Sequence, residues 1–290
     1  MALIVAVHGI GQQFKGDAII HREWWPALRS GLHLAGHDLT DERAMACPFY
    51  GHLFRRAGTL AVAEAEIDPA DVTPQEAELL EQWWHEAARI EPDKVKGPDY
   101  YTSQESLART PLLVQRALSA LTHSSFFADV YQSVIMGDLR QVTRYLNDPP
   151  IHDKALKIVV DAITAETRVV IGHSLGSVVA YEALCRDSRN VVSFVTLGSP
   201  LGIRNVIFDR LTPNPGFYGL GAWPGNVAHW TNLADPGDVV ALEKQLARGF
   251  GSRVRDVSVY SGADPHHGER YLTARETGEA VSAGLWGKDS

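Results

Sequence analysis

A short serine motif flanked by glycines is the sharpest chemical feature of the sequence. Gly172-His173-Ser174-Leu175-Gly176 matches the pattern G-x-S-x-G and directly follows the apolar run Val169–Ile171, and another apolar segment begins just behind it. A strand, a sharp turn and a helix form the context in which such a serine projects from the apex as a nucleophile. The helix N-terminus favours developing negative charge. We therefore expect Ser174 to be a catalytic nucleophile.

A serine hydroxyl is a poor nucleophile unless a base takes its proton and a carboxylate orients that base. Where the serine lies in a G-x-S-x-G turn, the acid and then the histidine follow it along the chain. Two later loops supply them in that order, one with Asp235 and Asp238 and the other with His266 and His267. The sequence thus predicts a Ser-His-Asp triad.

Each loop offers two choices. We favour Asp238 as the acid because it precedes the apolar run Val239–Ala241, which can anchor its backbone, and Asp235 stays the alternative. The neighbouring residues His266 and His267 cannot both point at one serine. We favour His266 as the base and keep His267 as the alternative.

The loop His8-Gly9-Ile10-Gly11 directly follows the first apolar run of the chain. Backbone N–H groups of such a loop and of the residue after the nucleophile can bind the oxyanion of a tetrahedral intermediate. We expect the N–H groups of Ile10 and Leu175 to form this oxyanion hole, each worth roughly 3–4 kcal/mol of transition-state stabilisation.

Motifs for cofactors and metals are missing from the sequence. It contains no GxxxxGK[ST] phosphate loop, no GxGxxG between a strand and a helix, and no H-E-x-x-H pair. His8, His173 and His266 are already used by the catalytic interpretation. We expect neither a cofactor nor a metal ion.

The elements that must position these residues alternate along the chain. Six apolar runs predict strands at 2–7, 43–50, 167–171, 191–197, 227–233 and 253–260, and helical patterns cover 129–146, 152–163 and 176–187. Near-continuous apolar strands alternating with helices are typical of an α/β fold with a mostly parallel central sheet flanked by helices. In such sheets ligands bind at the carboxyl ends of the strands, where the loops described above follow.

The segment 51–125 lies between the second and third predicted strands and is far longer than a minimal connection. Its sequence Thr73-Pro74-Gln75-Glu76 is a capping box that predicts a helix start. We expect one α/β domain over residues 1–290, with 51–125 as a helical insertion that packs on or caps it.

Three motifs together resemble the α/β-hydrolase superfamily: His8–Gly11, Gly172–Gly176 and the stretch Thr196-Leu197-Gly198-Ser199-Pro200-Leu201. The sequence is most similar to lipase- and esterase-like serine hydrolases of the bacterial and GPI-inositol-deacylase-like kind. The resemblance covers about 1–50 and 129–285. It implies an α/β-hydrolase fold and hydrolysis of an ester or a related acyl bond through an acyl-serine, without a metal. We expect the substrate to be a small-molecule or lipid-like acyl ester.

The chain departs from the family pattern at the usual place for a lid, after the strand that ends at Leu197. There the connection 202–226 is modest and rich in glycine and proline, and the larger insertion comes earlier. Three other functions stay open: acyl transfer by the same triad, a non-catalytic binding role for the fold, and a lipase acting at a membrane surface.

The amino-acid composition argues against several classes of binding partner. The 290 residues include 27 Lys+Arg and 35 Asp+Glu, a net charge of −8, which argues against a nucleic-acid-binding face. Two cysteines do not form a disulfide framework. The N-terminus lacks the basic and apolar regions of a signal peptide, and no apolar stretch reaches the roughly 20 residues of a membrane span. We expect a cytoplasmic protein without a transmembrane segment; its oligomeric state is open.

Overall fold

The computed structural model describes residues 2–55, 71–101, 111–124, 132–262 and 264–287, which belong to two compact units. The first unit comprises Met1–Arg55 and Asp148–Ser290, and the second comprises Arg56–Asn147. No helix among the described residues is both long and apolar enough to cross a membrane.

A parallel sheet forms the centre of the first unit. Within the described residues it has six strands in the order β2-β1-β3-β4-β5-β6, and every neighbouring pair is parallel. The strands are β1 (Ile4–Val7), β2 (Met45–Ala46), β3 (Val169–His173), β4 (Ser193–Leu197), β5 (His229–Ala234) and β6 (Val254–Ser258). This confirms the prediction of an α/β fold with a parallel sheet flanked by helices.

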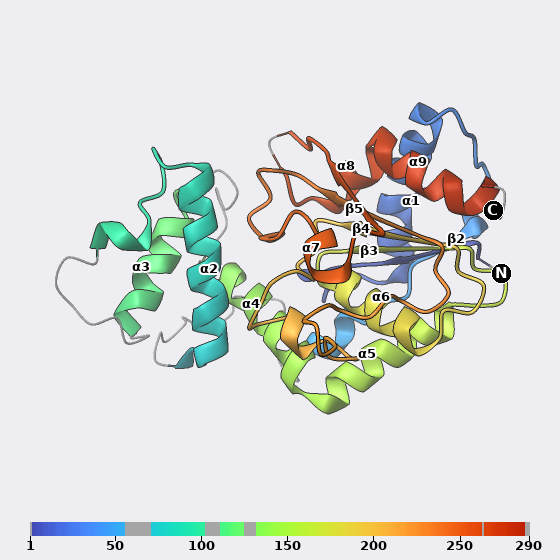
Figure 1. Ribbon diagram of the computed structural model, residues 1–290. Helices are drawn as coiled ribbons and strands as arrows, with labels where there is room; N and C mark the ends of the chain where they lie inside the picture. Colours follow the sequence, from blue (N-terminus) through green and yellow to red (C-terminus); the bar gives the residue numbers. More distant parts are fainter. Residues whose placement is uncertain (1, 56–70, 102–110, 125–131, 263, 288–290) are drawn as a thin grey trace. The chain divides into compact units, whose positions relative to one another are not determined.

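Helices cover both faces of the sheet (Figure 1). One face carries α1 (Asp17–Leu34), α8 (Gly268–Thr273) and α9 (Arg275–Trp286), and the other carries α5 (Pro149–Ala162) and α6 (Leu175–Arg186). The short helix α7 (Ala247–Phe250) packs beside β6. Because helices lie on both sides, β1, β3 and β4 are buried at every position, as their apolar sequences require.

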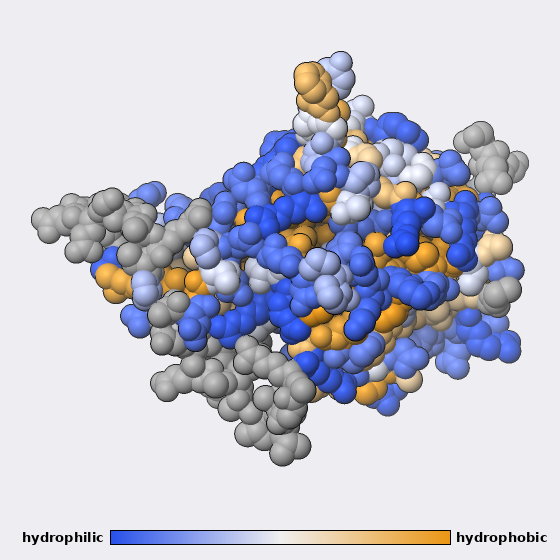
Figure 2. All heavy atoms as spheres, turned by 90° about the horizontal axis from the view of Figure 1, so that it is seen from below, coloured by the Kyte–Doolittle hydropathy of each residue, from blue (hydrophilic) through white to orange (hydrophobic). Residues whose placement is uncertain are grey.

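The core follows the two-residue period of the strands. On the α1 side, Ile4 and Ala6 of β1 and Val169 and Ile171 of β3 join one apolar cluster. The helices contribute Trp24, Trp25, Leu28, Tyr271, Leu272 and Val281 to the same cluster. Figure 2, which views the molecule from below, shows mostly hydrophilic side chains with apolar residues between them.

The strand order reverses beside β1. From β1 the chain moves outward to β2, and then crosses to β3 on the other side of β1. Ligands of open α/β sheets bind outside the carboxyl ends of the two strands at such a switch point. The loop after β1 and the turn after β3 contain the His8–Gly11 and G-x-S-x-G motifs, so both motifs lie at the switch point.

The described residues of the second unit form helices α2 (Pro74–Ile90), α3 (Pro111–Leu121) and α4 (Gln132–Asn147), with a 3₁₀ turn at Pro98–Tyr101. The predicted capping box is confirmed: the Thr73 hydroxyl accepts from the Glu76 N–H, and the Glu76 carboxylate accepts from the Thr73 N–H. The Trp84 indole donates to the Lys96 carbonyl at 2.7 Å. The buried apolar side chains of α2 are Ala77, Leu79, Leu80, Trp83, Trp84 and Ala87.

Several predicted bounds differ from the structure. The strand predicted at 43–50 is only Met45–Ala46, because the Asp41 carboxylate caps a 3₁₀ turn before it and Pro48 has no N–H to donate. Helix α5 begins at Pro149 rather than 152, since Asp148 caps its first turn. Residues 129–131 of the helix predicted at 129–146 lie outside the described residues.

The predicted insertion, 51–125, overlaps the second unit without matching it. Residues 51–54 form a 3₁₀ turn of the first unit, where Gly51 lies against Phe49 and the Arg55 guanidinium donates to the Gln13 carbonyl. At the other end the unit extends to Asn147 because α4 packs on α2 and α3. Residues 56–70, 102–110 and 125 of the prediction lie outside the described part of the chain.

Candidate active site

Ser174 occupies a sharp turn between β3 and α6. Its φ of 52° and ψ of −133° lie in a region that residues other than glycine rarely adopt. A Cβ on Gly172 would lie 2.5 Å from the Cα of Ser177, and one on Gly176 would lie 2.3 Å from the carbonyl oxygens of Val7 and His8. Both glycines of the motif are therefore required by close approaches of the backbone.

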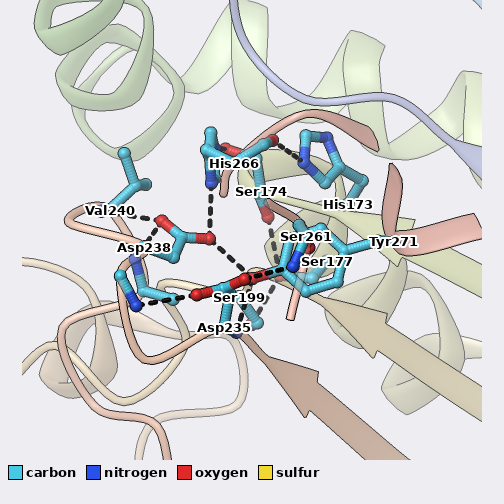
Figure 3. A network of polar contacts seen from close by, with 12 residues as sticks. His173, Ser174, Ser177, Ser199, Asp235, Asp238, Val240, Ser261, His266 and Tyr271 are labelled. Carbon is cyan, nitrogen blue, oxygen red and sulfur yellow. Dashed lines mark hydrogen bonds and ion pairs between the residues drawn. The ribbon is translucent and has the colours of Figure 1, made fainter. Parts of the chain in front are cut away.

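The structure joins three of the predicted residues in one chain of hydrogen bonds (Figure 3). The Nε2 atom of His266 lies 2.9 Å from the Ser174 hydroxyl oxygen, and its Nδ1 lies 2.8 Å from Oδ2 of Asp238. Asp238 belongs to the loop after β5 and His266 to the loop after β6. Three parallel strands thus deliver the three side chains to one edge of the sheet.

The Asp238 carboxylate is fully buried and saturated with donors. Its Oδ1 accepts from the N–H groups of Val240 at 2.9 Å and Ala241 at 3.2 Å, and its Oδ2 accepts from the Tyr271 hydroxyl at 2.8 Å. Burial alone would raise the pKa of Asp238, but the interaction with His266 and the further donors hold that pKa below its ordinary value. The carboxylate is ionised at neutral pH.

The two alternative residues have other partners. Asp235 accepts from the Gly237 N–H at 2.8 Å and from the Ser261 N–H, so it joins the loops after β5 and β6. The His267 ring pairs with the Glu269 carboxylate at 2.7 Å and is half exposed; this hydrogen bond raises the pKa of His267. The structure brings Asp238 and His266, rather than Asp235 and His267, to Ser174.

The predicted oxyanion loop lies directly against Ser174. A Cβ on Gly9 would come within 2.6 Å of the Ser174 Cβ and 3.2 Å of its hydroxyl oxygen. Ile10 follows Gly9, and Leu175 is the first residue of α6, where N–H groups have no acceptor inside the helix. The backbone at both predicted donor residues therefore adjoins Ser174.

The buried side chain of His8 stabilises this loop. Its ring stacks on Tyr50 with 4.2 Å between centroids, and its Nδ1 lies 2.8 Å from the Gly9 carbonyl oxygen. The Tyr50 N–H donates to Nε2 at 3.3 Å, so Nδ1 carries the proton of a neutral ring. Burial lowers the pKa of His8 to about 4, which keeps the ring uncharged at neutral pH.

Four residues support the site through contacts that sequence reasoning did not predict. The His173 ring donates to the His266 carbonyl, Tyr271 contacts Asp238, and the paired hydroxyls of Ser177 and Ser199, 2.6 Å apart, lie beneath the turn, where Ser177 donates to the Ser174 carbonyl. His173 stood inside the motif and Ser199 inside a family-like stretch, so position gave a signal for these two. Tyr271 and Ser177 gave none, because each lies in a helical segment as an ordinary core residue.

Known proteins give no guide to this site. Comparisons with protein-family models, curated proteins and solved structures found no match to the chain. Among the described residues, no three or more His, Cys, Asp or Glu side chains are grouped to hold a metal ion. The chemistry must be inferred from the geometry itself.

Proposed function

We propose that this protein is a serine hydrolase with an α/β-hydrolase fold, which cleaves a carboxylic ester through an acyl-serine intermediate. One observation carries the proposal: the continuous hydrogen-bond chain from Ser174 through His266 to the buried Asp238. The chain order Ser, Asp, His and the strand–turn–helix setting of Ser174 support the finer assignment of the fold.

In the first half-reaction, His266 is the general base. Its Nδ1–H donates to Asp238, which leaves the lone pair of Nε2 facing the Ser174 hydroxyl. The proton passes from the hydroxyl to Nε2 as the serine oxygen forms a bond to the ester carbonyl carbon. The N–H groups of Ile10 and Leu175 stabilise the resulting oxyanion.

The tetrahedral intermediate collapses when His266 returns this proton to the leaving alcohol oxygen and the ester C–O bond breaks. Water then replaces the alcohol. His266 removes a proton from the water as the water oxygen attacks the acyl-serine carbonyl. His266 returns that proton to the Ser174 oxygen as the bond to the acyl group breaks, and the carboxylic acid leaves. The proposed substrate is a small-molecule or lipid-like acyl ester. An alcohol in place of water would make the same site an acyltransferase.

The proposal is tested by covalent labelling. We expect a fluorophosphonate to add one adduct to the wild-type chain, with tryptic mapping to Ser174, and to add none to Ser174→Ala. Folded wild-type protein that takes up no adduct would overturn the proposal. Turnover of p-nitrophenyl esters of graded acyl length then defines the substrate range.

Substitution of His266 tests the proposed base, and substitution of the neighbouring His267 is its matched control. His266→Ala should abolish measurable labelling, because the serine loses its base. His267→Ala removes a half-exposed ring that pairs with Glu269 and should label at nearly the wild-type rate. Equal losses in both variants would contradict the assignment of His266.

A further inference from the structure

A buried tyrosine hydroxyl meets the same carboxylate oxygen as the imidazole of the proposed base. The Tyr271 oxygen lies 2.8 Å from Oδ2 of Asp238, and Nδ1 of His266 lies 2.8 Å from that oxygen as well. Tyr271 belongs to α8, five residues after His266, and is fully buried. Figure 3 shows the Tyr271 and His266 side chains on either side of the Asp238 carboxylate.

The direction of this hydrogen bond follows from counting donors. The Tyr271 oxygen also lies 2.8 Å from the main-chain nitrogen of Asp235, and an N–H can only donate. The hydroxyl therefore accepts from Asp235 and sends its single proton to Asp238. Burial, and to a smaller extent the adjoining carboxylates, raise the pKa of Tyr271 well above its ordinary value, so the hydroxyl keeps this proton.

We propose that Tyr271 is a positioning residue of the triad, which orients the Asp238 carboxylate and draws part of its negative charge away from His266. This inference rests on the proposed function. A carboxylate that shares its oxygen with a second donor stabilises the imidazolium less than one that serves the imidazole alone. Tyr271 thus sets how readily the base takes and returns its proton.

Close packing keeps the three groups together. Gly198 has a left-handed φ of 52°, and a Cβ there would lie 2.6 Å from Oδ2 of Asp238, 3.0 Å from the Tyr271 ring and 3.1 Å from Nδ1 of His266. The bare backbone of Gly198 therefore fits against the junction of all three side chains. The Tyr271 hydroxyl also connects the end of β5 to α8, which follows the base.

Other charged or titratable groups surround this junction. They are His173 of β3, Lys244, whose ammonium donates to the main-chain carbonyls of Asp238 and Ala241, and, further out, Asp235 and Glu269. Burial lowers the pKa of His173 to about 3, and the pKa of Asp238 lies below its ordinary value. Neither changes its charge between about pH 5 and about pH 9. The Glu269 carboxylate raises the pKa of the adjacent His267 ring from 6.5, so the fall in labelling rate at low pH, the acid limb, is also compared with that of His267→Ala.

The test compares the pH dependence of fluorophosphonate labelling of Ser174 in wild type and Tyr271→Phe. The phenylalanine ring keeps the packing and removes the donor. We expect the midpoint of the acid limb to move up by about 0.5–1 pH unit, and the plateau rate to fall because the carboxylate is less well oriented. Difluorotyrosine at position 271, a stronger donor, should move the midpoint down.

A second buried tyrosine serves as the control. Tyr181 lies on α6, and its hydroxyl donates to the Ala222 carbonyl at 2.9 Å, away from the triad. Tyr181→Phe should lower the thermal midpoint and leave the acid limb in place. If the wild type is labelled but the acid limb stays in place in both Tyr271→Phe and the difluorotyrosine protein, this inference is overturned. If the wild type is never labelled, the proposed function is overturned instead.

Discussion

The ring of His173 donates its Nε2–H to the main-chain carbonyl of His266, with 2.7 Å between nitrogen and oxygen. The residue before the proposed nucleophile therefore holds the loop of the proposed base. Burial lowers the pKa of His173 to about 3, so the ring is neutral at pH 7 and its Nε2 proton stays available for this bond. Trp24 packs edge-on against the same ring.

Substituting His173 tests this anchor. His173→Phe fills a similar volume but cannot donate, so His266 loses its main-chain restraint, and the labelling rate of Ser174 should fall roughly 10- to 100-fold. His173→Gln retains an N–H donor and should lose less. Labelling time courses measure both, with the exposed His33→Gln on α1 as control. A phenylalanine variant that labels at the wild-type rate would disprove the role of the anchor.

The two buried histidines also predict how stability depends on pH. Burial lowers the pKa of His173 to about 3 and that of His8 to about 4, whereas both rings have a pKa of 6.5 in an unfolded chain. Below pH 6.5 the unfolded state binds more protons, so the folded protein loses stability as pH falls from 6.5 towards 4.

Between pH 7 and pH 5 each ring should lower the free energy of unfolding by about 2 kcal/mol. Urea unfolding at the two pH values measures the loss. It should shrink by about 2 kcal/mol in His173→Phe and stay unchanged in His33→Gln. An identical loss in all three proteins would exclude His173 as a source of acid lability.

The two aspartates of the loop after β5 should differ in kind. Asp238→Asn loses the charge that faces His266 and favours the wrong imidazole tautomer, which should slow labelling by about three to four orders of magnitude. In Asp235→Asn the side-chain NH₂ faces a main-chain N–H from which the carboxylate accepted a hydrogen bond, so the free energy of unfolding should fall by about 1–3 kcal/mol. This variant should still be labelled at a rate within about tenfold of wild type. Labelling and urea unfolding of both variants separate the effects; a reversed order would reassign the acid.

The backbone of Ser174 predicts an unusual order of stabilities. Because φ is 52° there, any side chain at position 174 is strained, and glycine relieves the strain. Both Ser174→Gly and Ser174→Ala should be inactive, but the glycine variant should be more stable than the alanine variant by about 1 kcal/mol. Thermal unfolding side by side decides this, and a less stable glycine variant would argue that the turn is relaxed.

The local sequence predicted those parts of the molecule that depend on neighbouring residues. A G-x-S-x-G turn after an apolar run has few other structures open to it, so the position of Ser174 between β3 and α6 followed directly. The choice of Asp238 over Asp235 rested on the run behind it, and the N–H groups of Val240 and Ala241 in that run do bind its carboxylate.

Features that depend on distant contacts were not predicted. The edge strand β2 pairs with β1 over only two residues, and sequence patterns do not report how long an edge strand stays paired. Tyr271 was missed because a tyrosine in a short helix resembles any core aromatic. Only the fold, which brings α8 to the end of β5, gives its hydroxyl a carboxylate.

The start of α6 and the loop after β1 form one closely packed piece, since a Cβ on Gly176 would lie 2.3 Å from the carbonyl oxygens of Val7 and His8. That piece holds Ser174 and both proposed oxyanion donors, whereas His266 arrives on a separate loop. A His266→Ala chain therefore keeps Ser174 and the proposed oxyanion donors in place, with a gap where the imidazole ring stood. Free imidazole in solution should enter this gap and restore labelling to His266→Ala, so the missing base can be supplied as a reagent.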